Sequence, residues 1–322
     1  MRFTELGFEV TNGSTEALLK LGVPHSEANR EMNESELTRF LATGVEVYVY
    51  GGLEPASRTA LASAAKLKLI AFLGTGWADP GCIDSVASAE KGILVSNTPH
   101  ANAHSVAEYA LGAMIGAARN MYAMAGTADG KTGPTAGFDL YGKSLAIIGL
   151  GAIGSRLARF AHNGLGMRIL YFGPSRKASL EQELGAQRVT DLEDLFAQAD
   201  VVSVHASSTA DTRGLVDGTV LAAVTRPIVL VNCAVANIVD GHALYSALRN
   251  GGVKTAVFDE SYHDGDLTRK LRGLGPLKYI EFPHAAGSTG ESYERMTSMS
   301  FDCVSAYVKG APIPYLVQGR QA

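Results

Sequence analysis

The chain has 322 residues, of which 46% are hydrophobic and 19% are charged, and its formal net charge is −4. That length is typical of two domains, and the composition is that of a globular protein rather than a disordered one. The mildly acidic balance leaves no basic footprint for nucleic acid, and no apolar stretch reaches the roughly 18–20 residues that a membrane span needs. The scattered Cys82, Cys233 and Cys303 indicate a reducing compartment rather than a disulfide framework or a metal site. Since the first residues also lack the apolar run of a secretory signal, the expected location is the cytoplasm.

The first hundred residues predict a small α/β domain. Residues 45–50 and 67–73 read as strands, with helices at 34–42 and 57–65 before each of them. A long apolar-periodic helix follows at about 103–124, and a glycine-rich stretch at 126–137 ends it. This domain is expected to span 1–98 and to be completed by residues 286–322, whose helix at about 290–309 returns to it.

From residue 143 onward, apolar strands alternate with helical patterns. Six strands are predicted, and helices are read at 155–163 and 192–198; the strands are 144–149, 167–172, 200–205, 228–233, 253–258 and 279–282. Continuous apolar strands separated by helices are typical of a parallel sheet covered on both faces. We therefore expect an α/β protein, with a doubly wound, Rossmann-type dinucleotide-binding domain at 99–285 and a smaller, flavodoxin-like α/β domain for the substrate.

A glycine fingerprint follows the first of these strands. Gly149-Leu150-Gly151-Ala152-Ile153-Gly154 matches G-x-G-x-x-G between a predicted strand and a predicted helix, the context in which the motif binds a dinucleotide. Gly149 permits the tight turn, Gly151 lets the backbone approach the pyrophosphate, and Gly154 allows close helix–strand packing. The motif predicts a nicotinamide cofactor at the amino end of the helix, and the alternative is a tight turn without a ligand.

The next strand ends without an acidic residue. NAD sites usually offer Asp or Glu there for the ribose 2′-hydroxyl, whereas this chain has Ser175-Arg176-Lys177. Arg and Lys favour a 2′-phosphate, so the sequence predicts NADP over NAD. A solvated basic loop is the alternative.

At this point the chain resembles the D-isomer-specific 2-hydroxyacid dehydrogenase family, and in its basic loop the glyoxylate/hydroxypyruvate reductases. The resemblance rests on the glycine fingerprint and on dispersed matches in the same order; these are Gly74-Thr75-Gly76, Asn97-Thr98-Pro99, Ser105–Glu108, Asp200–His205, Thr212–Val216 and Pro283–Thr289. It implies that His205, Cys233 and Asp259 lie beside the cofactor, that the chain is a homodimer, and that the substrate is a small molecule. It also implies that Thr75, Gly76 and Trp77 lie beside the substrate.

The resemblance makes His284 the catalytic acid/base, which donates a proton to the carbonyl oxygen as hydride arrives; a packed structural histidine is the alternative. The family pairs this histidine with a carboxylate five residues after the aspartate that matches Asp259, and Asp264 stands there. Glu260 is a substitute if the loop is rearranged, and residues 262–266 are otherwise a polar surface loop. Asp264 is thus predicted to assist His284.

The chain departs from the family at its substrate arginine. In the family that arginine follows the fourth strand and holds the substrate carboxylate, but Val235 stands here. Valine makes no bidentate bond to a carboxylate, so poor turnover of simple 2-oxo acids is expected. The glycine loop is also longer than usual and carries Trp77, which either shapes a substrate pocket or serves an interface or the core.

The leading hypothesis is therefore an NADP-dependent oxidoreductase with an atypical substrate site. A non-catalytic nucleotide-binding sensor or scaffold competes with it because of Val235. A hydrolase with Cys233 or Cys82 as nucleophile finds no neighbouring histidine in the sequence.

Overall fold

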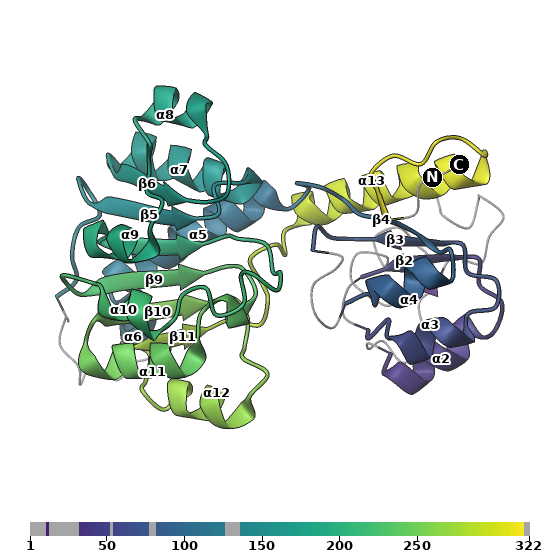
Figure 1. The fold of residues 1–322 in the computed structure, drawn as a ribbon, viewed down its shortest axis with the longest axis horizontal. Coiled ribbons are helices and arrows are strands. Elements are labelled where there is room, and N and C mark those ends of the chain that lie inside the picture. The colour runs from purple at the N-terminus through teal and green to yellow at the C-terminus, as the bar shows by residue number, and fades with distance from the viewer. Residues whose placement is uncertain (1–10, 13–31, 52–53, 77–81, 126–135, 319–322) are drawn as a thin grey trace. The chain divides into compact units, whose positions relative to one another are not determined.

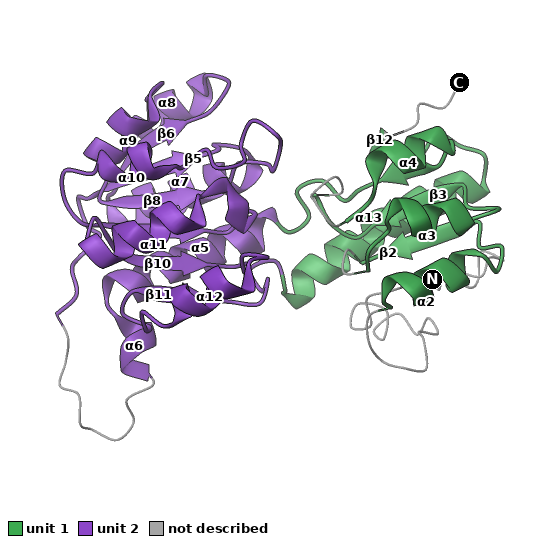
Figure 2. Ribbon diagram, turned by 60° about the horizontal axis from the view of Figure 1, so that its bottom comes forward, with its two compact units in different colours: residues 1–102, 288–322 green, residues 103–287 purple. Residues whose placement is uncertain are grey.

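The computed structural model describes residues 11–12, 32–51, 54–76, 82–125 and 136–318, and these form two compact α/β units (Figure 1). Unit 1 comprises residues 1–102 and 288–322, and unit 2 comprises residues 103–287 (Figure 2). The boundaries at 102 and 287 lie a few residues beyond the expected 98 and 285. Unit 2 is thus inserted into the chain of unit 1. Trp77 lies outside the described residues.

Unit 1 is a mostly parallel sheet with helices on both faces. Its strands lie in the order β1-β2-β3-β4-β12, and only β12 is antiparallel to its neighbour. One face of the sheet packs on α2, α3 and α4, and the other packs on α13. The elements are β1 (Thr11–Asn12), α2 (Glu34–Leu41), β2 (Val47–Tyr50), α3 (Arg58–Ser63), β3 (Leu69–Phe72), α4 (Ser85–Glu90), β4 (Leu94–Ser96), α13 (Gly290–Val308) and β12 (Leu316–Gln318).

Unit 2 is a doubly wound parallel sheet of seven strands, in the order β11-β10-β9-β8-β5-β6-β7. All neighbouring strands in it are parallel. The strands are β5 (Ser144–Ile148), β6 (Arg168–Phe172), β7 (Gln187–Arg188), β8 (Val201–Val204), β9 (Ile228–Asn232), β10 (Val253–Phe258) and β11 (Tyr279–Glu281). The helices are α5 (Ala103–Ala118), α6 (Met121–Ala125), α7 (Ala152–Leu165), α8 (Ala178–Leu184), α9 (Leu192–Gln198), α10 (Gly218–Ala222), α11 (Gly241–Asn250) and α12 (Gly265–Arg272), with the short 3₁₀ helix η2 (Ala236–Ile238). The α/β class and the Rossmann-type domain are confirmed.

The strands of unit 2 are apolar on both faces because helices cover both. Ile147 packs on the side of α5, α7 and α8, whereas the next residue, Ile148, packs on the side of α9, α10, α11 and α12. Both residues are at most 1% exposed. At roughly 25 cal/mol per Å² of buried apolar surface, these two layers supply the main stabilisation of the unit.

The helices begin and end at residues that satisfy their free backbone groups. Asn33 and Glu36 form a reciprocal capping box at the start of α2, and Asp191 and Asp240 cap α9 and α11 through their carboxylates. The predicted long helix at 103–124 is instead two helices, α5 and α6. The break lies at Asn120, whose φ of 55° interrupts the helix and whose side chain donates to the carbonyl of Ala136.

One face of α5 is used for packing within unit 2. Ala110, Ala113, Met114 and Ala117 are buried in the core layer that α5 shares with α7. Across the described residues, no helix is both long enough and apolar enough to cross a membrane. The same residues contain no group of histidine, cysteine and acidic side chains that could hold a metal ion.

Candidate active site

The glycine loop joins β5 to α7 and leaves the amino end of that helix open. Gly149 has a φ of +94°, and a Cβ there would lie 2.6 Å from the amide nitrogen of Ala206. A Cβ on Gly154 would lie 2.5 Å from the carbonyl oxygen of Gly149, whereas one on Gly151 would meet nothing within 4 Å. The first and third glycines are therefore required by packing, and the second faces open space.

This geometry fits a dinucleotide pyrophosphate. Gly151 caps α7 without a side-chain hydrogen bond, and the first turn begins with Ala152 and the half-buried Ile153. Backbone N–H groups and the positive end of the helix dipole attract phosphate at such a terminus. Gly149 and Gly154 thus have the packing roles that the sequence predicts for them, and the role of Gly151 beside a pyrophosphate stays a prediction.

The basic loop after β6 is built around Tyr171. The buried Tyr171 hydroxyl accepts from the backbone N–H of Lys177 at 2.8 Å and donates to Glu181 Oε1 at 2.7 Å. Arg176 Nε donates to Glu181 Oε2 at 2.7 Å, and Ser175 is exposed. The hydrogen bonds from Tyr171 and Arg176 lower the pKa of Glu181, which is therefore ionised at neutral pH.

The sequence did not single out Arg188, which also reaches this loop. Its Nη2 donates to the carbonyl oxygen of Gly173 at 2.9 Å and to that of Pro174 at 3.2 Å. Arg188 lies on β7, where it pairs with Tyr171 of β6. Arg188 reaches the loop because β7 pairs with β6, so no local sequence motif predicts its position.

His205 and Cys233 follow β8 and β9 at the same edge of the sheet as Gly149. The His205 amide donates to the carbonyl oxygen of Ile148 at 2.8 Å, and its Nε2 lies 2.8 Å from Ser203 Oγ. Burial lowers the pKa of His205 to about 4, so the ring is neutral, and burial also raises the pKa of the Cys233 thiol. A protonated thiol and a neutral ring fit a lining role beside a cofactor better than nucleophilic chemistry.

The segment that carries His284 is held by Asp259. The His284 amide donates to the Asp259 carbonyl oxygen at 2.8 Å. The Asp259 carboxylate accepts from the amides of Ala285 at 2.8 Å and Ala286 at 2.9 Å. His284 itself is exposed and has a φ of 56°, a left-handed conformation that is uncommon for a residue with a side chain.

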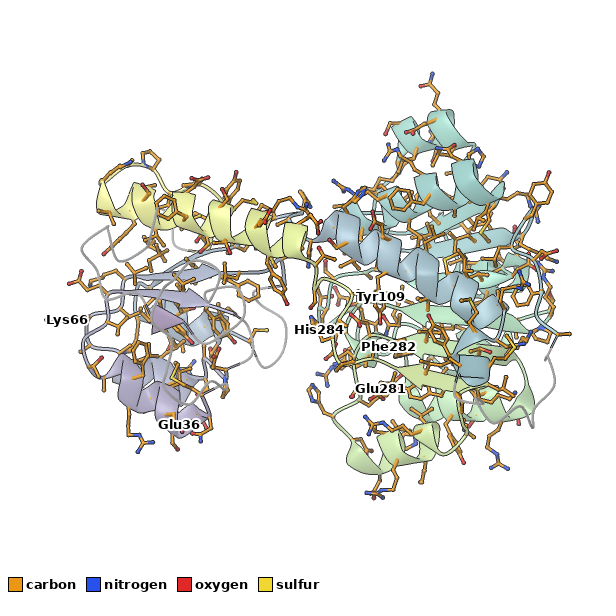
Figure 3. The ribbon with its side chains drawn as sticks, turned by 180° about the vertical axis from the view of Figure 1, so that it is seen from behind. Glu36, Lys66, Tyr109, Glu281, Phe282 and His284 are labelled. Atoms are coloured by element: carbon orange, nitrogen blue, oxygen red, sulfur yellow. The ribbon has the colours of Figure 1, made fainter. Side chains whose placement is uncertain are left out.

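Aromatic rings pack beside the residues that lead into this segment, and Figure 3 labels two of them, Tyr109 and Phe282. Phe282, two residues before His284, packs edge-on against Tyr109 of α5 and Tyr122 of α6, each at a centroid distance of 5.6 Å. Burial raises the pKa of Asp259, whereas the amides of Ala286 and Ala285 and the nearby His284 favour its charged form. The Asp259 carboxylate is thus a buried, multiply bonded anchor, 6% exposed.

Asp264 lies at the start of α12. It caps that helix, and its Oδ1 accepts from the amides of Asp266 at 2.9 Å and Leu267 at 3.1 Å. The amide of Leu267 is the main cause that lowers the Asp264 pKa, and the side chains that act on it are His242 and Lys270. Among the described residues, the carboxylates on which His284 acts electrostatically are Asp259 and the half-buried Glu260.

Val235 caps η2, three residues after the end of β9. Its half-buried side chain follows a turn in which Asn232 Oδ1 accepts from the Ala234 amide at 2.9 Å. The turn is thus fixed by Asn232, and an apolar side chain follows it.

The predicted substrate residues belong to unit 1. Thr75 is exposed and its Oγ1 lies 3.4 Å from Thr98 O and from Asn102 Oδ1, while its carbonyl oxygen accepts from Asn97 Nδ2 at 3.1 Å. Gly76 is half-buried. These bonds fix the loop after β3 against the segment that leads into α5.

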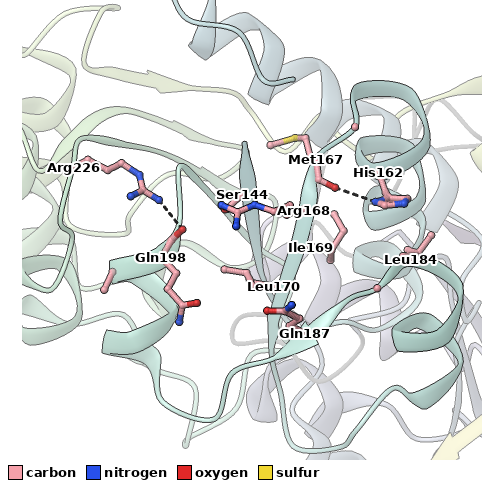
Figure 4. A pocket seen from close by; sticks show the side chains of 13 residues that line it. Ser144, His162, Met167, Arg168, Ile169, Leu170, Leu184, Gln187, Gln198 and Arg226 are labelled. Carbon is pink, nitrogen blue, oxygen red and sulfur yellow. Dashed lines mark hydrogen bonds between the residues drawn. The ribbon is translucent and has the colours of Figure 1, made fainter. Parts of the chain in front are cut away.

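A separate cavity of about 390 Å³ lies at the opposite, amino-terminal edge of the unit 2 sheet (Figure 4). Ser144 and Arg168 line it at the starts of β5 and β6, together with the last turns of α7, α8 and α9. Arg226 Nη2 donates to the Gln198 carbonyl oxygen and its Nε to Asp200, each at 2.8 Å. Three helix carboxyl ends give this cavity a negative partial charge that the arginines offset, so we assign it no ligand.

Comparisons with known proteins show the family to which the chain belongs. The model of the D-isomer-specific 2-hydroxyacid dehydrogenase NAD-binding domain matches residues 111–285. A glyoxylate reductase from Korarchaeum cryptofilum is 32% identical over 275 residues, which cover 82% of this chain and 80% of that protein. A D-3-phosphoglycerate dehydrogenase from Methanocaldococcus jannaschii is 32% identical over 79% of this chain, which spans 48% of that longer protein.

Among solved structures, the TT0316 protein from Thermus thermophilus superposes with a TM-score of 0.82 at 28% identity. The match covers 96% of this chain and 99% of that one. The similarity therefore extends over both units, with the glycine loop and the His284 segment included. The chain belongs to the D-isomer-specific 2-hydroxyacid dehydrogenase family and is a nicotinamide-dependent oxidoreductase.

Proposed function

We propose that the chain is an NADP-dependent reductase that acts on a carbonyl/hydroxyl pair, with His284 as its acid/base. The observation that carries the proposal is the Asp259 anchor, which holds an exposed histidine in a left-handed conformation in the unit that contains the glycine loop. Such backbone strain costs about 1–3 kcal/mol and persists where the surroundings fix it, often at active sites.

We propose that Glu260, the alternative to Asp264, is the carboxylate that assists His284. A carboxylate beside an imidazole favours its charged form and prepares it to donate a proton. Glu260 follows Asp259 directly, so the hydrogen bond between the Asp259 carbonyl and the His284 amide brings its backbone close to the histidine. Burial raises the pKa of Glu260 above its ordinary 4.5, and His284, Ala236 and His263 lower it in turn.

The chemistry follows from these positions. The glycine loop would hold the pyrophosphate of a nicotinamide dinucleotide, which would supply the hydride. His284 donates its proton to the carbonyl oxygen of the substrate in the reductive direction and accepts one in the reverse direction. Glu260 stabilises the imidazolium, and the Asp259 anchor keeps the ring in place.

The substrate is proposed to differ from a simple 2-oxo acid. The relative from Korarchaeum cryptofilum is named a glyoxylate reductase, which suggests a 2-oxo acid. Val235 offers no charge to a substrate carboxylate, and loss of one charged contact in such a site costs several kcal/mol. We therefore propose a carbonyl substrate whose recognition does not depend on an arginine at this position.

The proposal is tested by titrating the full chain with NADPH and NADH and then adding a panel of 2-oxo acids, aldehydes and ketones. We expect NADPH to bind more tightly and at least one panel member to oxidise it. The His284→Asn variant is expected to keep NADPH binding and to lose turnover by about 10²–10⁴-fold, the usual contribution of a general acid. Robust turnover of glyoxylate or pyruvate by the unchanged chain would contradict the substrate clause.

A second candidate is a non-catalytic NADP-binding sensor, which Val235 favours. It predicts tight NADPH binding with no oxidation by any panel member, and no change of NADPH binding in the His284→Asn variant. Turnover that depends on His284 rules it out. The cytoplasmic location and the homodimer that the family resemblance implies stay predictions.

A further inference from the structure

Arg188 lies beside the loop that follows β6. In a Rossmann-type unit the second strand ends beside the adenosine ribose of a bound dinucleotide, and here this strand is β6. Arg188 pairs with Tyr171 on β6, and its side chain passes to the loop that follows, where Nη2 donates to Gly173 O and Pro174 O. These two bonds use Nη2 alone, and a guanidinium carries five N–H donors. Arg188 therefore has a fixed position and donors to spare.

The other arginine of the loop is already paired. Arg176 Nε bonds to Glu181 at 2.7 Å, and the remaining oxygen of Glu181 accepts from Tyr171. An ion pair with Glu181 offsets much of the attraction of Arg176 for an incoming phosphate. No carboxylate of the described residues lies within ion-pair distance of Arg188, although its charge acts on both Tyr171 and Glu181.

The charge of the loop favours a phosphate. The loop and its neighbour β7 carry three cations, Arg176, Lys177 and Arg188, and each oxygen of Glu181 already accepts a hydrogen bond. Glu181 is thus less able to bind the hydroxyls of an unphosphorylated ribose, as an acidic residue does in NAD sites. The exposed Arg188 guanidinium presents a planar fork, the geometry that matches phosphate oxygens.

We infer that Arg188, with Lys177 beside it, is the principal ligand of the 2′-phosphate of NADP(H), and that Arg176 mainly holds Glu181. This inference rests on the proposed NADP preference. It assigns recognition of the 2′-phosphate to Arg188 on β7, outside the loop that the sequence identifies.

The test compares dissociation constants for NADPH and NADH in the full chain and in single variants. Arg188→Gln is expected to weaken NADPH binding about tenfold and NADH binding less than twofold, because a charged hydrogen bond to phosphate is lost. Arg176→Gln is expected to weaken NADPH binding only about threefold. Arg269→Gln removes a cation of α12 that pairs with Asp266, and it is the matched control that leaves both constants unchanged.

Two further measurements separate the outcomes. Arg188→Lys keeps the charge without the fork and is expected to give an intermediate NADPH constant, and thermal melting reports whether each variant is folded. Equal weakening of NADPH and NADH by Arg188→Gln would mean that Arg188 only shapes the loop, and a larger loss in Arg176→Gln would move the phosphate to Arg176. Either result overturns the inference but leaves the NADP preference intact, whereas equal affinity of the unchanged chain for both nucleotides refutes that preference itself.

Discussion

His284 and its neighbours illustrate how much a single residue depends on its partners. The motif around His284 identified the residue, but spacing alone pointed to Asp264 as its partner. The structure gives Asp264 to the start of α12, because an aspartate before a helix satisfies two free amides there. The five-residue spacing from Asp259 identifies the partner of the histidine only where the loop keeps the conformation that it has in the family. In this chain Asp264 is engaged as a helix cap.

Removal of the charge of Glu260 therefore tests which carboxylate assists His284. Glu260→Gln is expected to lower kcat/KM for reduction, because the protonated imidazole that donates the proton loses a negative neighbour. Asp259, on which His284 also acts, is left in place in this variant, as is His263 near Glu260. The measurement is kcat/KM for reduction at a series of pH values.

Asp264→Asn is the matched control, since asparagine also caps helices and only the charge is lost. Its kcat/KM values are expected to coincide with those of the unchanged chain. A loss in Asp264→Asn with none in Glu260→Gln would return the role to Asp264.

Among the helices and strands, the buried strands were the easiest to predict from the sequence. Strands such as β9 and β10 are covered on both faces and read as unbroken apolar runs, so their position was predictable within a residue or two. The two-residue edge strand β7 carries only exposed Gln187 and Arg188 and has no apolar pattern to detect. The break between α5 and α6 was also missed, because it depends on the backbone of Asn120 and not on hydrophobic period.

The glycine loop gives a prediction that separates packing from binding. Gly154→Ala places a methyl 2.5 Å from the Gly149 carbonyl, so it is expected to destabilise unit 2 by about 1–3 kcal/mol, the usual cost of overpacking. Gly151→Ala meets open space and is expected to cost under about 1 kcal/mol, yet to weaken NADPH binding about tenfold or more, because the methyl occupies the approach of the pyrophosphate.

Denaturant unfolding and NADPH titration on both variants check this pair. A Gly151→Ala protein that binds NADPH normally would show that the loop is only a tight turn.

On the scale of the whole molecule, the division into two units follows from where the cores lie. Both hydrophobic layers of unit 2 draw only on residues within 103–287. One layer of unit 1 combines strand residues such as Val49 and Leu69 with Met296 and Val304 of α13. The alternation of apolar strands and helices in the sequence predicts the larger unit. The antiparallel pairing of β12 with β4 has no local sequence signal.

Residues 103–287 are therefore expected to fold as an isolated fragment and to bind NADPH within about threefold of the full chain. A cooperative unfolding transition and a nucleotide titration measure this. A fragment of residues 1–102 is expected to remain unfolded, because it lacks the α13 side chains of its core. Failure of the longer fragment to fold would show that unit 2 needs the rest of the chain.

The insertion of unit 2 into unit 1 also orders the events of synthesis. A ribosome makes every residue of the unit 2 core before it makes α13, which covers one face of the sheet of unit 1. A premature stop codon before residue 290 is therefore expected to give a chain that has the whole core of unit 2 but exposes Val47, Val49 and Leu69 of unit 1.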